Sequence, residues 1–203
     1  MIINFLAVVF VWVAPVSGLQ LHLPIGVACR TNAHNIYLTK IGAFGLIRKA
    51  RPSVPAHYHT GIDLKRPTSN YTNEPVYASA KGKVISMRNE GPFSQIIIEH
   101  LIKTRDTVWT VYEHISVGNC HVGNAVAENT VIARFFNKAE LDRYGWQFDH
   151  VHFEILKVRP LKIKPSKSQP ECFYKTYAIT CFTLDKLNSR MINPLGYFAK
   201  NTP

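Results

Sequence analysis

Acidic residues and cysteines are scarce in this sequence, and its longest apolar run falls short of a membrane span. Only 13 Asp and Glu stand against 24 Lys and Arg, which gives a formal net charge of +11 at pH 7. The motif H-E-x-x-H is absent, which excludes a zinc-binding helix that carries its own glutamate base. The cysteines form no C-x-x-C pair, which argues against a cysteine zinc site. Internal repeats and low-complexity segments are also lacking.

The apolar run stands at the start of the chain. Residues 1–13 are almost wholly apolar, and small residues follow at Val16 and Gly18. A membrane-spanning helix needs about 20 apolar residues, so residues 1–18 are interpreted as a secretory signal cleaved near Gly18. This predicts a secreted or periplasmic protein. No Lys or Arg precedes Arg30, so the usual positive start of a signal is missing and an uncleaved anchor is the alternative.

Export would make the cysteines candidates for disulfide bonds. We predict a bridge between Cys172 and Cys181, because their separation is short and residues 173–177 between them are strand-like, as in a hairpin clasp. Four buried free thiols are the alternative. The cysteines are Cys29, Cys120, Cys172 and Cys181.

The length suits one domain with extensions, and its pattern is that of β-strands from Val76 onward. Lys81 and Gly82 can form a hairpin turn, and residues 96–98 read as a buried strand. One or two short helices interrupt this pattern. The first starts at a capping-box-like Asn137 and Glu140, runs through Arg143 and ends at Gly145. The second covers residues 184–190 behind a threonine cap at Thr183.

The stretch from Asp149 to Leu156 holds two histidines one residue apart within an alternating, strand-like run. In a strand, side chains two residues apart share a face. One face would then turn to the core, and the other would carry His150, His152 and Glu154. The core face would hold Val151, Phe153 and Ile155. Such a pair suits a metal ligand beside a proton-transfer group, or it is incidental on a half-exposed strand.

His59 and Asp63 complete a ligand set with His152. Zinc takes histidine nitrogens and a carboxylate oxygen, and a catalytic zinc site keeps three protein ligands and one open position. Gly61 and nearby prolines argue that the first two lie on a loop entering a strand rather than on a helix. His114 follows an alternating run that would place it with Val108, Thr110 and Tyr112 on one face, from which it could lean over the same groove.

At these residues the sequence resembles the lysostaphin and LytM type of zinc endopeptidases, which cut the peptides of bacterial cell walls. Three motifs stand in the family's order: H-x-G-x-D at residues 59–63, Y-x-H-[LI]-S at 112–116 and H-x-H-F-E at 150–154. Residues 74–84 also resemble the strand, turn and strand that follow the first motif. The resemblance covers roughly residues 54–160.

The resemblance implies an all-β fold, an antiparallel two-sheet barrel-sandwich with a catalytic domain at residues 54–160. Residues 19–53 would be an N-terminal extension and 161–203 a basic C-terminal extension packed on the core. The implied activity is zinc-dependent hydrolysis of peptide bonds in peptidoglycan. One Zn²⁺ would be held by His59, Asp63 and His152, while His114 and His150 move protons.

Two other functions remain open. The family includes non-catalytic members that act as binding or regulatory modules, although these usually lack a ligand or a catalytic histidine. A basic exported adhesin would explain the charge but would leave the five site positions to chance. From Glu154 to the end, nine Lys or Arg stand against three acids, which points to an anionic cell-envelope surface as partner. No nucleic-acid motif is present, and we expect a monomer.

The sequence allows two interpretations for the position of several other side chains. His100 reads as a structural histidine at a strand end, and His57 as an exposed loop residue that could instead line the site. Trp109, Tyr144 and Trp146 could wall a substrate groove, but Trp146 is assigned to the core. Glu154 either orients a metal ligand or faces solvent.

Overall fold

The computed structural model describes residues 20–198 apart from residues 33, 35, 104 and 105. The predicted signal at residues 1–18 therefore lies outside the described residues. None of the described helices is long and apolar enough to cross a membrane.

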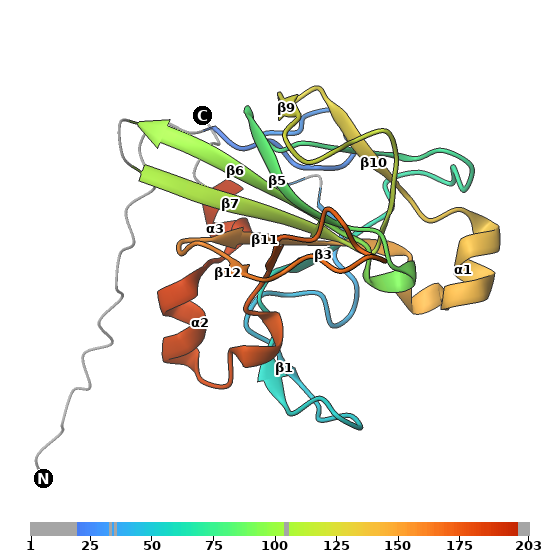
Figure 1. Cartoon of the computed structure of the whole chain (residues 1–203). Helices are drawn as coiled ribbons and strands as arrows, with labels where there is room; N and C mark the ends of the chain where they lie inside the picture. The colour runs from blue at the N-terminus through green and yellow to red at the C-terminus, as the bar shows by residue number, and fades with distance from the viewer. Residues whose placement is uncertain (1–19, 33, 35, 104–105, 199–203) are drawn as a thin grey trace, which may run out of the picture.

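Antiparallel sheets dominate the fold, with β6 and β7 as the longest pair (Figure 1). A seven-stranded sheet has the order β14-β11-β7-β6-β5-β9, and β3 shares one edge of β11 with β14. Its strands are β3 (Ile62–Lys65), β5 (Gly82–Arg88), β6 (Gln95–Lys103), β7 (Asp106–Glu113), β9 (Ala125–Val126), β11 (His150–Leu156) and β14 (Met191–Ile192).

A second sheet has the order β4-β10-β8, and two further pairs of short strands lie outside both sheets. These strands are β4 (Pro75–Tyr77), β8 (Ile115–Val117) and β10 (Val131–Phe135), with β1 (Ile47–Arg48) paired to β2 (His57–Tyr58) and β12 (Leu161–Lys162) to β13 (Tyr174–Lys175). The expected antiparallel, sandwich-like all-β fold is confirmed. Among the described strands the sheets do not close into a barrel.

The main core takes residues from both larger sheets, such as Ile98 and Phe153 from one and Phe135 from the other. A second cluster covers the opposite face of the seven-stranded sheet and includes Ile97 and, from α2 (Leu184–Arg190), Leu187. Consecutive residues of β6 thus enter different clusters, because side chains alternate along a strand. The predicted buried strand at residues 96–98 is confirmed, and it is buried on both faces.

Segments outside residues 54–160 also enter these clusters. Leu21, Leu23 and Ile25 are fully buried in the main core. Toward the other end of the chain, Met191 belongs to the second cluster and Phe198 to the main core. Chain segments on both sides of the three motifs therefore contribute to the packing that supports them.

The two predicted helices form where their caps indicated. α1 (Lys138–Tyr144) begins behind a complete capping box of Asn137 and Glu140 and ends at Gly145. α2 (Leu184–Arg190) begins at Thr183, whose side chain accepts a hydrogen bond from the backbone of Lys186. A further α-helix, α3 (Pro194–Phe198), was not predicted from the sequence. Single 3₁₀ turns are η2 (Gly91–Phe93), η3 (Trp146–Phe148) and η4 (Ala178–Thr180).

The prediction of a hairpin turn at Lys81 and Gly82 is wrong. β4 and β5 belong to different sheets, and Gly82 is the first residue of β5, paired with Val126 of β9. A Cβ on Gly82 would lie 2.6 Å from the backbone oxygen of Glu99. Glycine therefore allows a close approach of strands here rather than a tight turn.

The predicted bridge between Cys172 and Cys181 is not formed, and all four cysteines are free thiols in the structure. A strand does form between them, but it covers only Tyr174 and Lys175. These residues pair with β12 instead of forming a hairpin within that loop. Cys181 is fully buried in the second cluster. The Cys172 thiol instead lies 3.9 Å from the backbone oxygen of Tyr174.

His100 is a structural histidine, as predicted, but it lies within β6 rather than at a strand end. Its side chain is fully buried, with Nδ1 2.9 Å from the Lys81 carbonyl oxygen and Nε2 2.7 Å from Thr110 Oγ1. Burial lowers its pKa to about 4, so the folded protein holds it neutral at pH 7. The unfolded chain, with a pKa near 6.5, binds more protons between these values.

We therefore expect the free energy of unfolding to fall as the pH drops from about 6.5 to about 4, with His100 contributing on the order of 3 kcal/mol. Denaturant unfolding at a series of pH values measures this loss. The variant His100→Asn should show a shallower pH slope over the same range. Identical slopes for variant and parent would assign the acid sensitivity to other groups.

Candidate metal centre and active site

The register of four neighbouring strands puts a row of polar side chains on one face of the seven-stranded sheet. Asp63 of β3 is paired with His152 of β11, which is paired with Glu113 of β7, which in turn is paired with Gln95 of β6. Residues directly opposite one another in an antiparallel pair share a face. Their side chains therefore emerge together, on the face opposite the main core.

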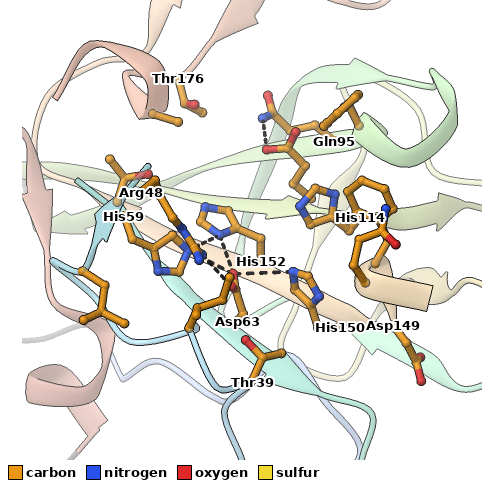
Figure 2. Close-up of a pocket in the computed structure, with 18 of the residues that line it drawn as sticks. Thr39, Arg48, His59, Asp63, Gln95, His114, Asp149, His150, His152 and Thr176 are labelled. Carbon is orange, nitrogen blue, oxygen red and sulfur yellow. Dashed lines mark hydrogen bonds and ion pairs between the residues drawn. The ribbon is translucent and has the colours of Figure 1, made fainter. Parts of the chain in front are cut away.

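His59, Asp63 and His152 converge at this face (Figure 2). His59 Nε2 lies 3.0 Å and His152 Nδ1 2.9 Å from the same carboxylate oxygen, Asp63 Oδ1, and the two nitrogens are 2.9 Å apart. All three side chains are buried. His59 lies between β2 and β3 rather than on a helix, as expected. Their ligand atoms lie within 4.8 Å of one another, so the group could hold a metal ion.

Each histidine of this group uses its other ring nitrogen for a second contact. His59 Nδ1 lies 2.9 Å from the carbonyl oxygen of Ala43, and His152 Nε2 lies 3.1 Å from Glu154 Oε1. Histidine ligands of metals are typically oriented by such partners. The alternative in which Glu154 faces solvent is wrong, because this side chain is only 1% exposed and also accepts a hydrogen bond from Thr60.

Burial and hydrogen bonding compete in setting the charges of this group. Burial alone would lower the pKa of His152, but its hydrogen bonds with Asp63 and Glu154 raise the pKa to about 10. For Asp63, burial opposes ionisation, yet the hydrogen bonds with His152 and His59 bring its pKa well below the usual value. The carboxylate is therefore charged, and without a metal a proton on His152 balances it.

His114 and His150 lie beside this group. Their ring centroids are 4.9 Å apart, and His150 Nε2 is 3.6 Å from Asp63 Oδ1. His150 Nδ1 is buried and has no hydrogen-bond partner among the described residues. His114 Nδ1 donates to the carbonyl oxygen of Pro92 at 2.5 Å, and its Nε2 has no hydrogen bond to the described residues. Burial lowers both pKa values, that of His150 to about 3, so both rings are neutral at pH 7.

His114 reaches the site for a different reason from the one that alternation suggested. Its predicted face-mates Val108 and Tyr112 point into the main core, while Trp109 and Val111 lie in the second cluster. Continued alternation would have turned His114 toward the main core. The residue instead adopts a left-handed backbone with φ of 63°, between the end of β7 and the start of β8. This change of backbone direction carries the ring over the groove.

Arg48 is a site residue that lies outside the three motifs and was not predicted from the sequence. Its guanidinium donates to Asp63 Oδ2 at 2.7 Å, while Oδ1 of the same carboxylate faces the histidines. β1 places it there through the pairing of Arg48 with His57 on β2. No spacing in the sequence indicates that contact, since it depends on how β1 pairs.

A groove of about 1480 Å³ runs over the site. Aromatic residues on one wall include Phe93, Phe148 and Trp146. The assignment of Trp146 to the core was wrong, because it is 48% exposed and contacts the ring of Tyr71 edge-on. His57 was expected in an exposed loop but is buried on β2.

Of the other proposed groove aromatics, Trp109 is buried in the second cluster and Tyr144 packs on Phe136. Neither lines the groove.

Comparison with known families gives one decisive match. The profile of peptidase family M23 matches residues 57–165, which is more than half of the chain and includes all three motifs. The chain belongs to peptidase family M23. The resemblance to the lysostaphin and LytM type is thereby confirmed. No curated protein sequence matches.

Solved structures show the fold that this M23 chain shares. A chain of the SpoIIIAH and SpoIIQ complex matches with a TM-score of 0.50 at 19% identity, over 87% of this chain and 99% of that one. The catalytic domain of the antimicrobial peptidase lysostaphin from Staphylococcus simulans matches with a TM-score of 0.44 at 18% identity, over 81% and 93% of the two chains. LytU matches with a TM-score of 0.42 at 25% identity, over 60% and 74%.

Proposed function

We propose that this M23 protein is an exported zinc-dependent endopeptidase that hydrolyses peptide bonds in bacterial cell-wall peptidoglycan. The observation that carries the proposal is the convergence of three buried ligand atoms, from His59, Asp63 and His152, beside two neutral histidines. Membership of a peptidase family supports the reaction class. The groove above the site has a volume of about 1480 Å³, more than the roughly 300–1,000 Å³ of pockets for small molecules, which leaves room for a peptide.

The side chains fit zinc rather than a harder cation. Two imidazoles and one carboxylate are the kind of donor set that zinc accepts, whereas calcium and magnesium prefer oxygen ligands. His59 and His152 would each bind through the nitrogen that faces Asp63, because their other nitrogens already contact Ala43 and Glu154. When bound, zinc would supply Lewis acidity at the scissile carbonyl and lower the pKa of water.

The chain's own residues would then move the protons. His114 holds its Nδ1 proton on Pro92 and presents a free Nε2, which can accept a proton from the attacking water. His150 has a buried, unpartnered Nδ1, and it can donate to the oxyanion or to the leaving amine once protonated. The two roles can also be exchanged between these rings. The neutral state of both at pH 7 leaves either able to act as the base.

Digestion of purified cell walls tests this function. Zinc-loaded protein is incubated with walls of several peptide types, and mass spectrometry of the soluble products identifies the bond that is cut. We expect peptide fragments whose release stops when a chelator removes zinc and resumes when zinc is restored. Absence of fragments from every wall type, with zinc bound, would contradict the proposal.

A non-catalytic binding or regulatory module is the second candidate. It is supported by the match to a chain solved as part of the SpoIIIAH and SpoIIQ complex, a protein assembly. The intact set of five site residues favours the enzyme. Binding of zinc-loaded protein to walls without release of fragments would favour the module instead.

Arg48 gives the metal site a separate test. Because its guanidinium holds Asp63 Oδ2, it fixes the carboxylate with Oδ1 toward the histidines. Replacing Arg48 by alanine should therefore weaken zinc binding by roughly 10–100-fold, the usual effect of losing a partner of a metal ligand. Competition against a zinc-binding dye measures the affinity. Lys49→Ala, an exposed neighbour, is the control, and tighter binding by the Arg48 variant would show that the cation opposes the metal.

A further inference from the structure

The groove has an excess of positive charge that its own acids do not balance. Eight Lys or Arg line it against four Asp or Glu. Three of the acids are already neutralised by one arginine each, in the pairs Arg48 with Asp63, Arg66 with Asp149 and Arg88 with Glu113. Glu90 is the only other acid in this lining. The unbalanced cations are Lys40, Lys49, Arg51, Lys65 and Lys175.

These five cations are available to a ligand. Each is exposed, and among the described residues none has a hydrogen bond or ion pair to its side chain. Exposed cations that stand together without partners raise the local concentration of anions. A zinc ion in the group below would add to the positive charge of the groove.

Cations and aromatic rings both lie around the metal group in the groove. Arg48 and Thr176 lie on one side of His152, and His114 and Gln95 lie on the other (Figure 2). Two of the exposed cations, Lys49 and Lys175, are sequence neighbours of the first pair. The ring of His114 instead contacts the aromatic rings of Phe93 and Phe148. Another exposed cation, Lys65, is paired with His150, so the cations are not confined to one side of the metal group.

We infer that the substrate is a peptide with free carboxylates, which the unpaired cations of the groove would hold. This inference rests on the proposed function and adds to it the chemical class of the substrate. The charge excess of the groove argues against a neutral or cationic peptide.

The test measures binding, so that it does not depend on cleavage. The probes are two fluorescein-labelled octapeptides, alternating Ala-Glu and alternating Ala-Gln, which differ only in charge. Fluorescence anisotropy with the zinc-loaded full chain gives both affinities, and mass spectrometry checks that each probe stays intact. We expect the acidic probe to bind about tenfold tighter at low salt, and the preference to vanish near 1 M salt, where the screening length is about 3 Å.

Charge-reversed variants locate the effect. Lys49→Glu combined with Arg51→Glu should abolish the preference for the acidic probe. The control combines Lys138→Glu with Lys167→Glu, two exposed residues outside the groove with the same change in net charge. Circular dichroism confirms that both variants fold.

Equal binding of the two probes by the parent would overturn the inference. Equal loss in both variants would also overturn it, because the net charge and not the groove would then be responsible. If walls are not cut but the groove variant alone loses the acidic probe, the proposed hydrolysis fails while the inference about the groove stands.

Discussion

Replacing either His114 or His150 by alanine should leave zinc bound and the protein folded, while cell-wall hydrolysis falls by roughly 10²–10⁴-fold, the usual contribution of general acid–base catalysis. Neither ring is needed for the three-ligand group, since His114 contacts Pro92 and His150 stands 3.6 Å from Asp63. A loss of rate without a loss of metal is therefore the signature of proton transfer.

The measurement pairs zinc content by elemental analysis with the rate of peptide release from purified walls. His121→Ala is the matched control, because His121 is exposed and does not line the groove. Hydrolysis at the parent rate by both test variants, with activity still lost on zinc removal, would show that the two-histidine mechanism is wrong.

Replacing Asp63 by alanine should remove the metal. This carboxylate contacts both histidines of the group through Oδ1 and Arg48 through Oδ2, so the variant loses one ligand and leaves the guanidinium unpaired beside the other two. Zinc affinity should fall by more than the roughly 10–100-fold that loss of an outer partner costs. Hydrolysis should disappear with the metal.

Elemental analysis after dialysis reports the zinc content per chain, with Asp185→Ala as an exposed carboxylate control outside the groove. The alanine variant should retain no stoichiometric zinc, whereas the control should retain a full equivalent. A full equivalent in the Asp63 variant would remove this residue from the metal site.

Much of the centre could be predicted from local pattern. Alternation along residues 150–156 correctly assigned Val151, Phe153 and Ile155 to the core, because a strand turns successive side chains to opposite faces whatever its neighbours are. The histidines opposite them are also buried, since other segments cover that face. Burial on the second face depends on packing and is not encoded in the alternation.

Contacts between segments that are distant along the chain could not be predicted from the sequence. Arg48 meets Asp63 only because β1 pairs with β2, and a two-residue strand has no periodicity to read. The predicted bridge between Cys172 and Cys181 was wrong for a similar reason. The two cysteines are close along the chain, but their thiols pack against different elements. The face to which His114 turns was predicted wrongly although the preceding strand was predicted correctly, because the backbone of His114 is left-handed.

That backbone angle has a consequence for how the protein can change. A residue with a Cβ held in the left-handed region costs on the order of 1 kcal/mol, which glycine would not incur. The contacts of the His114 ring with Phe93, Phe148 and Pro92 therefore have to offset this cost in the folded protein. Laboratory evolution that changes Phe93 or Phe148 can thus alter the orientation of this ring while His114 itself stays the same.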